Sequence, residues 1–161
     1  MEQSFVPENF EVPKTLRDTP FRLSVLEPSV AEIDYQVVMS SRERLRGVFN
    51  EYDNWPADDL SLAANIRDLV RHQREFEARI AFAYAVHECD GAGYWGCIYI
   101  EPSDTEYDAE VYLWVSDAQI ARDKQLYDVV KAWVANDWPF RRVAYPGREP
   151  SWPRWREITG P

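Results

Sequence analysis

The hydrophobic pattern near the start of the chain predicts one strand followed by one helix. Apolar and polar side chains alternate over residues 21–26, which is the pattern of a half-buried strand. Apolar positions then recur at helical spacing and predict a helix over 29–38. Ser29 stands at the start of this stripe and Glu32 follows three residues later, so Ser29 is expected to be the N-cap residue.

The clearest helix is predicted over residues 61–79, where one face is apolar and the opposite face is charged. The apolar stripe consists of Leu62, Ile66, Leu69, Val70 and Phe76. The preceding residues, 50–59, contain Trp55-Pro56 and predict a loop.

The second half of the chain predicts three consecutive strands, a helix and a final strand. Their ranges are 80–88, 94–101, 109–115, 123–135 and 142–145. Strands joined by short turns should pair antiparallel, whereas a helical crossover should place the last two strands parallel. The predicted fold class is therefore α/β (α+β), with a mixed, mostly antiparallel sheet and helices on both faces.

The domain organisation predicted from these patterns is simple. Residues 1–20 contain several prolines and no periodicity, which predicts an extended N-terminal arm whose aromatic side chains rest on the domain. Residues 21–161 form one predicted domain, a length that suits a single core.

Charge narrows the choice of partners. The 161 residues include 28 acidic and 18 basic side chains, which give a formal net charge of −10. Basic residues are interleaved with acidic ones, so no patch suited to the phosphates of nucleic acid is expected. The longest apolar run, 80–86, is too short to span a membrane, and residues 1–5 lack signal-peptide features. The sequence therefore predicts a soluble, cytoplasmic protein with neither a nucleic-acid nor a membrane partner.

Several familiar sites are not predicted. Cys89 and Cys97 lack the spacing of a metal site or a redox motif, so they are expected to be free thiols, and no metal is expected. Residues 91–96 match the literal dinucleotide fingerprint G-x-G-x-x-G. Because the following residues predict a strand and not a helix, these glycines are interpreted as a hairpin turn.

The order of elements resembles that of the GNAT-type N-acetyltransferases over residues 21–145. The resemblance is carried by Phe21-Arg22-Leu23, by Trp95-Gly96-Cys97-Ile98-Tyr99-Ile100 and by Ala109-Glu110-Val111-Tyr112-Leu113-Trp114-Val115. It implies a GNAT-like acyl-CoA N-acyltransferase fold with acetyl-CoA as co-substrate. Acetyl-CoA would lie where the strands at 109–115 and 142–145 diverge.

The resemblance also implies roles for individual residues. The pantetheine and diphosphate of acetyl-CoA would contact Trp114, Val115, Ala121, Arg122, Asp123 and Lys124. Glu110 is the best match to the catalytic base, and Glu101 is the alternative; the acceptor amine would attack the thioester carbonyl directly. Tyr127 or Tyr145 would replace the tyrosine acid of the family.

The sequence departs from the family at the diphosphate loop. The family pattern is Gln or Arg, two residues, Gly, one residue, then Gly or Ala, whereas residues 118–123 contain no glycine. Asp123 is also expected to be the N-cap residue of the next helix, where its carboxylate would oppose a diphosphate.

The second departure is at the C-terminus. About 16 residues follow Tyr145, too few for the family's last helix and two strands, which are therefore predicted to be lacking. Trp152 and Trp155 would instead cover the sheet or form a homodimer contact.

Two functions remain open. The chain is either an acetyl-CoA-dependent N-acetyltransferase that acts on a small-molecule or peptide amine, or a non-catalytic GNAT-fold binding or dimerisation module that has lost acyl-CoA binding. Four aromatic side chains are expected on one sheet face, either as core or as a ligand groove: Trp95, Tyr99, Tyr112 and Trp114.

Overall fold

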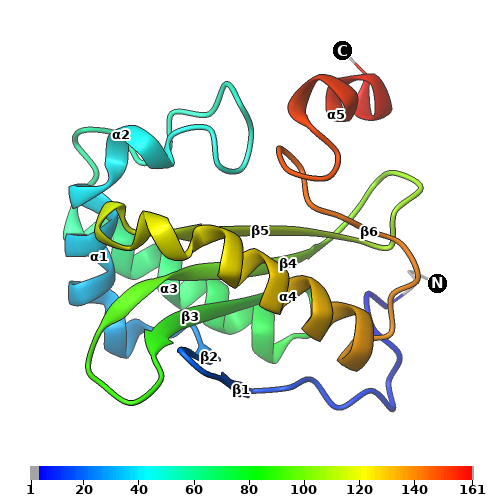
Figure 1. Cartoon of the computed structure of the whole chain (residues 1–161), viewed down its shortest axis with the longest axis horizontal. Helices are drawn as coiled ribbons and strands as arrows, with labels where there is room; N and C mark the ends of the chain where they lie inside the picture. The colour runs from blue at the N-terminus through cyan, green and yellow to red at the C-terminus, as the bar shows by residue number, and fades with distance from the viewer. Residues whose placement is uncertain (1–3, 161) are drawn as a thin grey trace.

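The computed structural model describes residues 4–160 and contains one six-stranded sheet (Figure 1). Its strands, adjacent in chain order, are β1 (Thr15–Asp18), β2 (Phe21–Val25), β3 (Phe82–Glu88), β4 (Tyr94–Pro102), β5 (Ala109–Val115) and β6 (Val143–Ala144). Neighbours from β1 to β5 pair antiparallel, and β5 pairs parallel with β6. The predicted mixed, mostly antiparallel sheet is confirmed.

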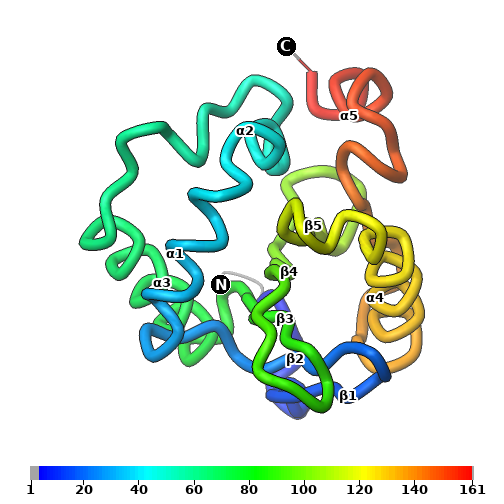
Figure 2. The backbone as a smooth tube through the Cα atoms, turned by 60° about the vertical axis from the view of Figure 1, so that its left-hand side comes forward, coloured from blue at the N-terminus to red at the C-terminus, as the bar shows by residue number. Residues whose placement is uncertain are grey.

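Helices cover both faces of this sheet, as predicted. They are η1 (Pro28–Val30), α1 (Ala31–Ser40), α2 (Arg42–Leu45), α3 (Leu62–Glu77), η2 (Asp117–Arg122), α4 (Asp123–Asp137) and α5 (Trp152–Thr159). Figure 2 shows α1, α2 and α3 on one side of the strands and α4 on the other. The four-residue helix α2 was not predicted.

The helices α3 and α1 differ in how their N-termini are capped. The Ser61 hydroxyl accepts the Ala64 N–H at 3.0 Å, so α3 begins with a side-chain cap. The prediction for Ser29 is wrong: this residue lies in η1 and its hydroxyl donates to Glu27, while α1 begins two residues later without a side-chain cap.

The N-terminal segment contributes more than a surface arm. Its last residues form β1, which pairs with β2 over four residues. Val6 is buried, the Phe5 ring stacks on Phe82, and the Tyr84 hydroxyl donates to the Pro13 carbonyl at 2.6 Å. This segment therefore completes the core on the α4 side of the sheet.

The aromatic side chains of β4 and β5 divide between the two faces. Tyr99, Tyr112 and Trp114 pack on the side of α1 and α3, but Trp95 packs on the α4 side. The prediction of one shared face is thus wrong for Trp95. The β3–β4 register shifts between Val86 and His87, and this irregularity reverses the alternation before Cys97.

The chain after β6 forms a helix that was not expected. Ser151 caps α5 by accepting the Arg154 N–H, and a proline occupies its first turn. The prediction that no helix follows is therefore wrong, although no strand follows β6 within the described residues.

Candidate functional site

The sheet opens where β5 and β6 diverge. These strands pair only at Ala109 with Val143 and at Glu110 with Ala144. Within residues 4–160, no strand pairs with the remainder of β5, Val111 to Val115, on this side. β5 and β6 therefore separate beside the start of α4, as the sequence led us to expect, and the unpaired edge of β5 is here called the β5–β6 cleft.

Arg148 enters the β5–β6 cleft from the segment after β6. Its two terminal nitrogens donate to the Asp123 carboxylate at 2.7 and 2.9 Å, which is bidentate pairing. One of them also lies 3.4 Å from the Leu113 carbonyl of β5. The two side chains are only 27% and 25% exposed, so the pair occupies the space between β5 and α4.

A second arginine occupies the end of β5. The Arg44 guanidinium donates to the Val115 carbonyl, and its Nε lies 2.5 Å from the Asp117 carboxylate. The Asp117 N–H in turn donates to the Ser41 hydroxyl at 2.9 Å. The carbonyls of Leu113 and Val115 thus both have internal arginine donors.

The loop before α4 uses its own amide hydrogens. The Gln119 N–H donates to the Ser116 carbonyl, and the Asp123 N–H donates to the Ile120 carbonyl. The prediction that Asp123 is an N-cap residue is wrong. Asp123 is the first residue of α4, and its carboxylate pairs with Arg148. Lys124 is exposed and pairs with Asp128 one turn later.

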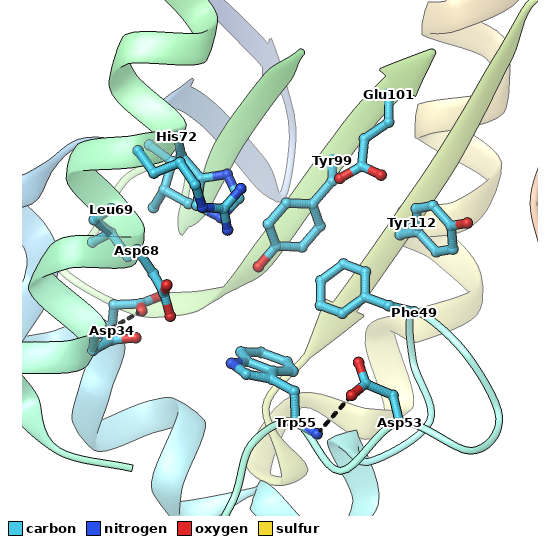
Figure 3. Close-up of a pocket in the computed structure, with 13 residues that line it drawn as sticks. Asp34, Phe49, Asp53, Trp55, Asp68, Leu69, His72, Tyr99, Glu101 and Tyr112 are labelled. Atoms are coloured by element: carbon cyan, nitrogen blue, oxygen red, sulfur yellow. Dashed lines mark hydrogen bonds between the residues drawn. The ribbon is translucent and has the colours of Figure 1, made fainter. Parts of the chain in front are cut away.

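A cavity of about 360 Å³ lies on the opposite face of the sheet (Figure 3). Its lining comes from α1, α3, β4, β5, the residue after β2 and the loop before α3: Leu26, Asp34, Phe49, Asp53, Trp55, Asn65, Asp68, Leu69, Arg71, His72, Tyr99, Glu101 and Tyr112. We call this space the aromatic–acidic cavity, because four aromatic rings and four carboxyl groups line it.

Glu101 lies at one end of this cavity, and a second glutamate stands beside it on the next strand. Glu101 of β4 and Glu110 of β5 are direct cross-strand partners. Burial, and then the neighbouring Glu110 carboxylate, raise the pKa of Glu101 to about 7. Glu110 accepts a hydrogen bond from the Tyr112 hydroxyl at 2.6 Å. Glu101 can therefore exchange a proton near neutral pH.

A buried carboxyl group lies at the other end of the aromatic–acidic cavity. Asp34 of α1 is 3% exposed; its oxygens accept hydrogen bonds from the Tyr94 hydroxyl at 2.5 Å and the Asn65 amide at 2.9 Å. Burial raises the pKa of Asp34 in spite of these bonds. This network links α1, α3 and β4 beside the cavity.

Two further side chains of α3 that line the cavity have shifted pKa values. Burial raises the pKa of Asp68 and lowers the pKa of His72 to about 4, so the imidazole is neutral at pH 7. The His72 ring lies 5.4 Å from that of Tyr99, whose hydroxyl accepts the Trp114 indole N–H at 3.0 Å. The wall of the aromatic–acidic cavity thus combines aromatic rings with carboxyl groups that form no ion pair within residues 4–160.

Comparison with known protein structures identifies the fold of this chain. No protein-family model and no curated protein matches this sequence. The ribosomal-protein-S5-alanine acetyltransferase of Vibrio fischeri superposes with a TM-score of 0.62 at 14% identity, covering 91% of this chain and 81% of that one. A ribosomal L7/L12 α-N-protein acetyltransferase in complex with coenzyme A superposes with a TM-score of 0.59 at 13% identity, covering 76% and 68%. This chain has the GNAT fold.

The GNAT fold implies acyl-CoA, and the residues at the β5–β6 cleft do not fit it. A diphosphate needs free amide hydrogens and positive potential at the helix start, whereas Asp123 places a carboxylate there that pairs with Arg148, and the Gln119 and Asp123 amides are bonded within the loop. The pantetheine was expected to bond to the backbone near Trp114 and Val115. Two arginines already donate to the carbonyls of Leu113 and Val115 in this stretch.

The structure divides the predicted site residues between two places. Glu101 lines the aromatic–acidic cavity and Glu110 is its cross-strand partner, whereas Tyr127 packs in the opposite layer against Tyr145. The six predicted acetyl-CoA residues lie along β5 and around the start of α4: Trp114, Val115, Ala121, Arg122, Asp123 and Lys124. Trp114 is buried, Ala121 is exposed, and Arg122 stacks on Trp95 with 4.5 Å to the ring centroid.

The α1 and α3 side of the cavity was not predicted from the sequence. Asp34 stands four residues from both Val30 and Val38, on the apolar stripe of its helix. Asn65 similarly stands four residues before Leu69 on the α3 stripe. A polar residue within an apolar stripe is the signal that would have found both.

No metal site accompanies the cavity. Within residues 4–160, no group of three or more His, Cys, Asp or Glu side chains has the arrangement of a metal centre. In the same part of the chain, every helix is too short or too polar to cross a bilayer.

Proposed function

We propose that this protein is a GNAT-fold binding protein for an organic amine, held in the aromatic–acidic cavity, and that it has lost acyl-CoA binding. The observation that carries the proposal is the contrast between a cavity with unneutralised carboxyl groups and a cleft filled by Arg148 paired with Asp123. Ligand pockets are typically apolar concavities with a few polar groups that fix orientation. The aromatic–acidic cavity has this character.

The charge of the cavity supports an amine as the ligand. Asp34, Asp68 and Glu101 are absent from the ion pairs formed within residues 4–160. Desolvation opposes the charged form of each of these carboxyl groups, and a bound ammonium would offset that penalty. The aromatic faces of Trp55 and Tyr99 would add cation–π attraction.

Thermal-shift titration with acetyl-CoA and with free CoA tests the loss of acyl-CoA binding. A ligand that binds only the folded state raises its stability, so the proposal expects no shift of the melting temperature at millimolar concentrations. A saturable upward shift, or an acetylated product formed from acetyl-CoA and a primary amine, would overturn this part of the proposal. A titration with alkylamines tests the other part and should raise the melting temperature.

The second candidate is an N-acetyltransferase, and the Glu101–Glu110 pair favours it. A carboxylate with a pKa of about 7 suits the removal of a proton from a bound ammonium group near neutral pH. Glu101 would accept that proton and leave the amine neutral and nucleophilic. This candidate requires Glu101→Gln to abolish acetyl transfer while amine binding persists; an unchanged rate would remove it.

A further inference from the structure

A row of basic side chains crosses the first three strands of the sheet. Arg17 of β1 is the direct cross-strand partner of Arg22 of β2, and Arg22 is in turn the partner of His87 of β3. Directly opposed residues of antiparallel strands have their side chains on the same face of the sheet. His87 also lies opposite Tyr94, which packs on the side of α1 and α3, so the row belongs to that face. We call these three residues the basic row.

This corner of the sheet is open to solvent. β1 is the edge strand, and α1 and α3 lie over the neighbouring strands β4 and β3 (Figure 2). On the face of the basic row, Thr15 and Arg17 are exposed. Arg22 and His87 are half-buried. A ligand can therefore reach all three side chains of the row from solvent.

The positive charge of the basic row is only partly neutralised. Arg22 belongs to no ion pair within residues 4–160. Arg17 has one partner, Asp90, at 3.1 Å, and the two side chains are 61% and 81% exposed. Like charges that lie directly opposite each other destabilise a sheet, and an anion bound between them would relieve this repulsion. The basic row is thus a local excess of positive charge on a chain whose net charge is −10.

His87 adds a titratable group to one end of the row. Burial, and then the charge of Arg22, lower the pKa of His87, and no carboxylate within residues 4–160 offsets them. The Tyr94 ring lies 5.5 Å away, and its hydroxyl donates to Asp34. The His87 Nε2 lies 3.0 Å from the Ser24 hydroxyl, which leaves Nδ1 as the second hydrogen-bonding atom of the ring. An anion bound beside Arg22 would therefore raise the pKa of this imidazole.

We propose that the basic row binds the phosphate group of a small phosphate monoester, with Arg22 as the central ligand and Arg17 and His87 on either side. A guanidinium group pairs with two phosphate oxygens at once. The charge of a phosphate monoester near pH 7, about −1.5 to −2, matches two arginines, whereas a carboxylate has a single charge. This site lies on other strands than the aromatic–acidic cavity and is independent of the amine binding proposed above.

The extent of the positive charge favours a small ligand over an acidic peptide or a nucleic acid. Neighbouring strands lie about 4.8 Å apart, so the row spans only about 10 Å, which suits one phosphate group. Carboxyl groups border it. Asp90 pairs with Arg17. At the other end, Glu88 directly follows His87 in the chain. A polyanion would extend beyond the row, and the net charge of −10 would repel it.

NMR titration of the full chain with ethyl phosphate tests the inference, because the chain has only two histidines. At constant ionic strength, the imidazole signals of His87 should shift saturably at about millimolar ligand, and its pKa should rise. The signals of His72, which lines the aromatic–acidic cavity, should stay in place and serve as the internal control. Sodium chloride at the same ionic strength is the blank.

Three variants sharpen the test. Arg22→Gln should weaken ethyl phosphate binding about tenfold or more. Asp90→Asn should strengthen it, because Arg17 then loses the carboxylate that competes with the ligand. Arg74 of α3 is exposed and belongs to no ion pair within residues 4–160, so Arg74→Gln is the matched control and should change nothing. Circular dichroism of each variant establishes that it is folded.

Several results would overturn the inference. A His87 shift that sodium chloride reproduces would identify screening of Arg22 and not binding. Equal affinity for acetate would overturn the choice of phosphate, and a phosphoserine peptide that binds about tenfold or more tightly than ethyl phosphate would overturn the small ligand. An unchanged affinity in Arg22→Gln, or a weakened one in Asp90→Asn, would overturn the assignment to the basic row. None of these results would affect amine binding at the aromatic–acidic cavity.

Discussion

The two faces of β5 differ in how their charges are neutralised. In the β5–β6 cleft, Arg148 pairs with Asp123, and Arg44 pairs with Asp117 while binding the Val115 carbonyl. In the aromatic–acidic cavity, Glu101 has no ion-pair partner within residues 4–160. A region whose charges are paired internally loses those pairs when a charged ligand binds. A region with unpaired buried carboxyl groups gains from a cationic ligand. Folding has already removed these carboxyl groups from water, and the ligand supplies the compensating charge.

The largest expected effect comes from removing the buried carboxyl group that supports the cavity. Asp34→Ala removes the acceptor of two short buried hydrogen bonds and leaves the Tyr94 hydroxyl and the Asn65 amide with weaker partners at 3.3 Å, the Cys97 thiol and the Ala31 carbonyl. We expect a loss of about 3 kcal/mol in the free energy of unfolding, measured by urea denaturation. Asp34→Asn keeps the shape and one acceptor oxygen and should lose clearly less. Equal losses in the two variants would contradict a hydrogen-bonding role for this side chain.

The pH dependence of stability should reveal the unpaired Glu101 carboxyl group. Its pKa is raised from 4.5 to about 7, so its contribution is present below pH 4.5 and is lost as the pH rises through 7. His72, with its pKa lowered to about 4, acts in the opposite direction between about pH 4 and 6.5. Glu110 of β5 and Glu75, Arg71 and His72 of α3 are the charged or titratable groups near Glu101.

Glu101→Gln should therefore gain stability relative to the wild type as the pH rises from 5 to 8, by about 2 kcal/mol or less. Urea denaturation across this pH range measures the difference. The matched variant Glu106→Gln, whose carboxylate is exposed outside the cavity, should show no such gain. A difference that is independent of pH would contradict burial of the Glu101 charge. For the same reason, binding of a cationic ligand should strengthen as the pH rises through 7.

Opening the β5–β6 cleft should have a smaller effect on stability. Arg148→Ala removes the bidentate pair with Asp123, and we expect a loss of about 1 kcal/mol by denaturation, because both side chains are only about a quarter exposed. Amine binding at the cavity should stay unchanged, because Arg148 does not line it. A weakened amine affinity in this variant would show that the two faces of β5 are coupled.

The smallest effect is expected at Lys124, a predicted acetyl-CoA residue. Its side chain is 86% exposed and pairs only with Asp128 one turn later. Lys124→Ala should therefore leave the denaturation midpoint and amine binding unchanged. A measurable change in the response to acetyl-CoA would argue for the diphosphate role that the resemblance implied.

Local patterns predicted most of the sheet and one side of the site. The alternation in β2, β4 and β5 and the turn before β4 were sufficient to place Glu101 and Glu110 on neighbouring antiparallel strands. They did not predict the irregularity at Trp95, because an extra residue in one strand leaves no mark on the hydrophobic pattern. β1 was also missed, since its four residues are mostly exposed and lack alternation.

The partners of the charged residues could not be predicted in the same way. Arg148 lies 25 residues from Asp123, and Arg44 lies 73 residues from Asp117. Nothing in the local sequence of either arginine indicates its partner, because the pairing depends on where β6 ends and how α2 packs. The glycine-free loop indicated a departure from the diphosphate pattern of the family, but not that arginines would bind the adjacent carbonyls of β5.

By itself, the sequence determined the order of strands and helices, the mixed sheet and the acidic character of the chain. These depend on side-chain periodicity and composition, which act over a few residues. Only the tertiary structure decided that the carboxyl groups of Asp34, Asp68 and Glu101 surround one cavity while Asp123 and Asp117 are neutralised by arginines. Burial and pairing are properties of segments distant in the chain, and they alone set which of these charges is left for a ligand.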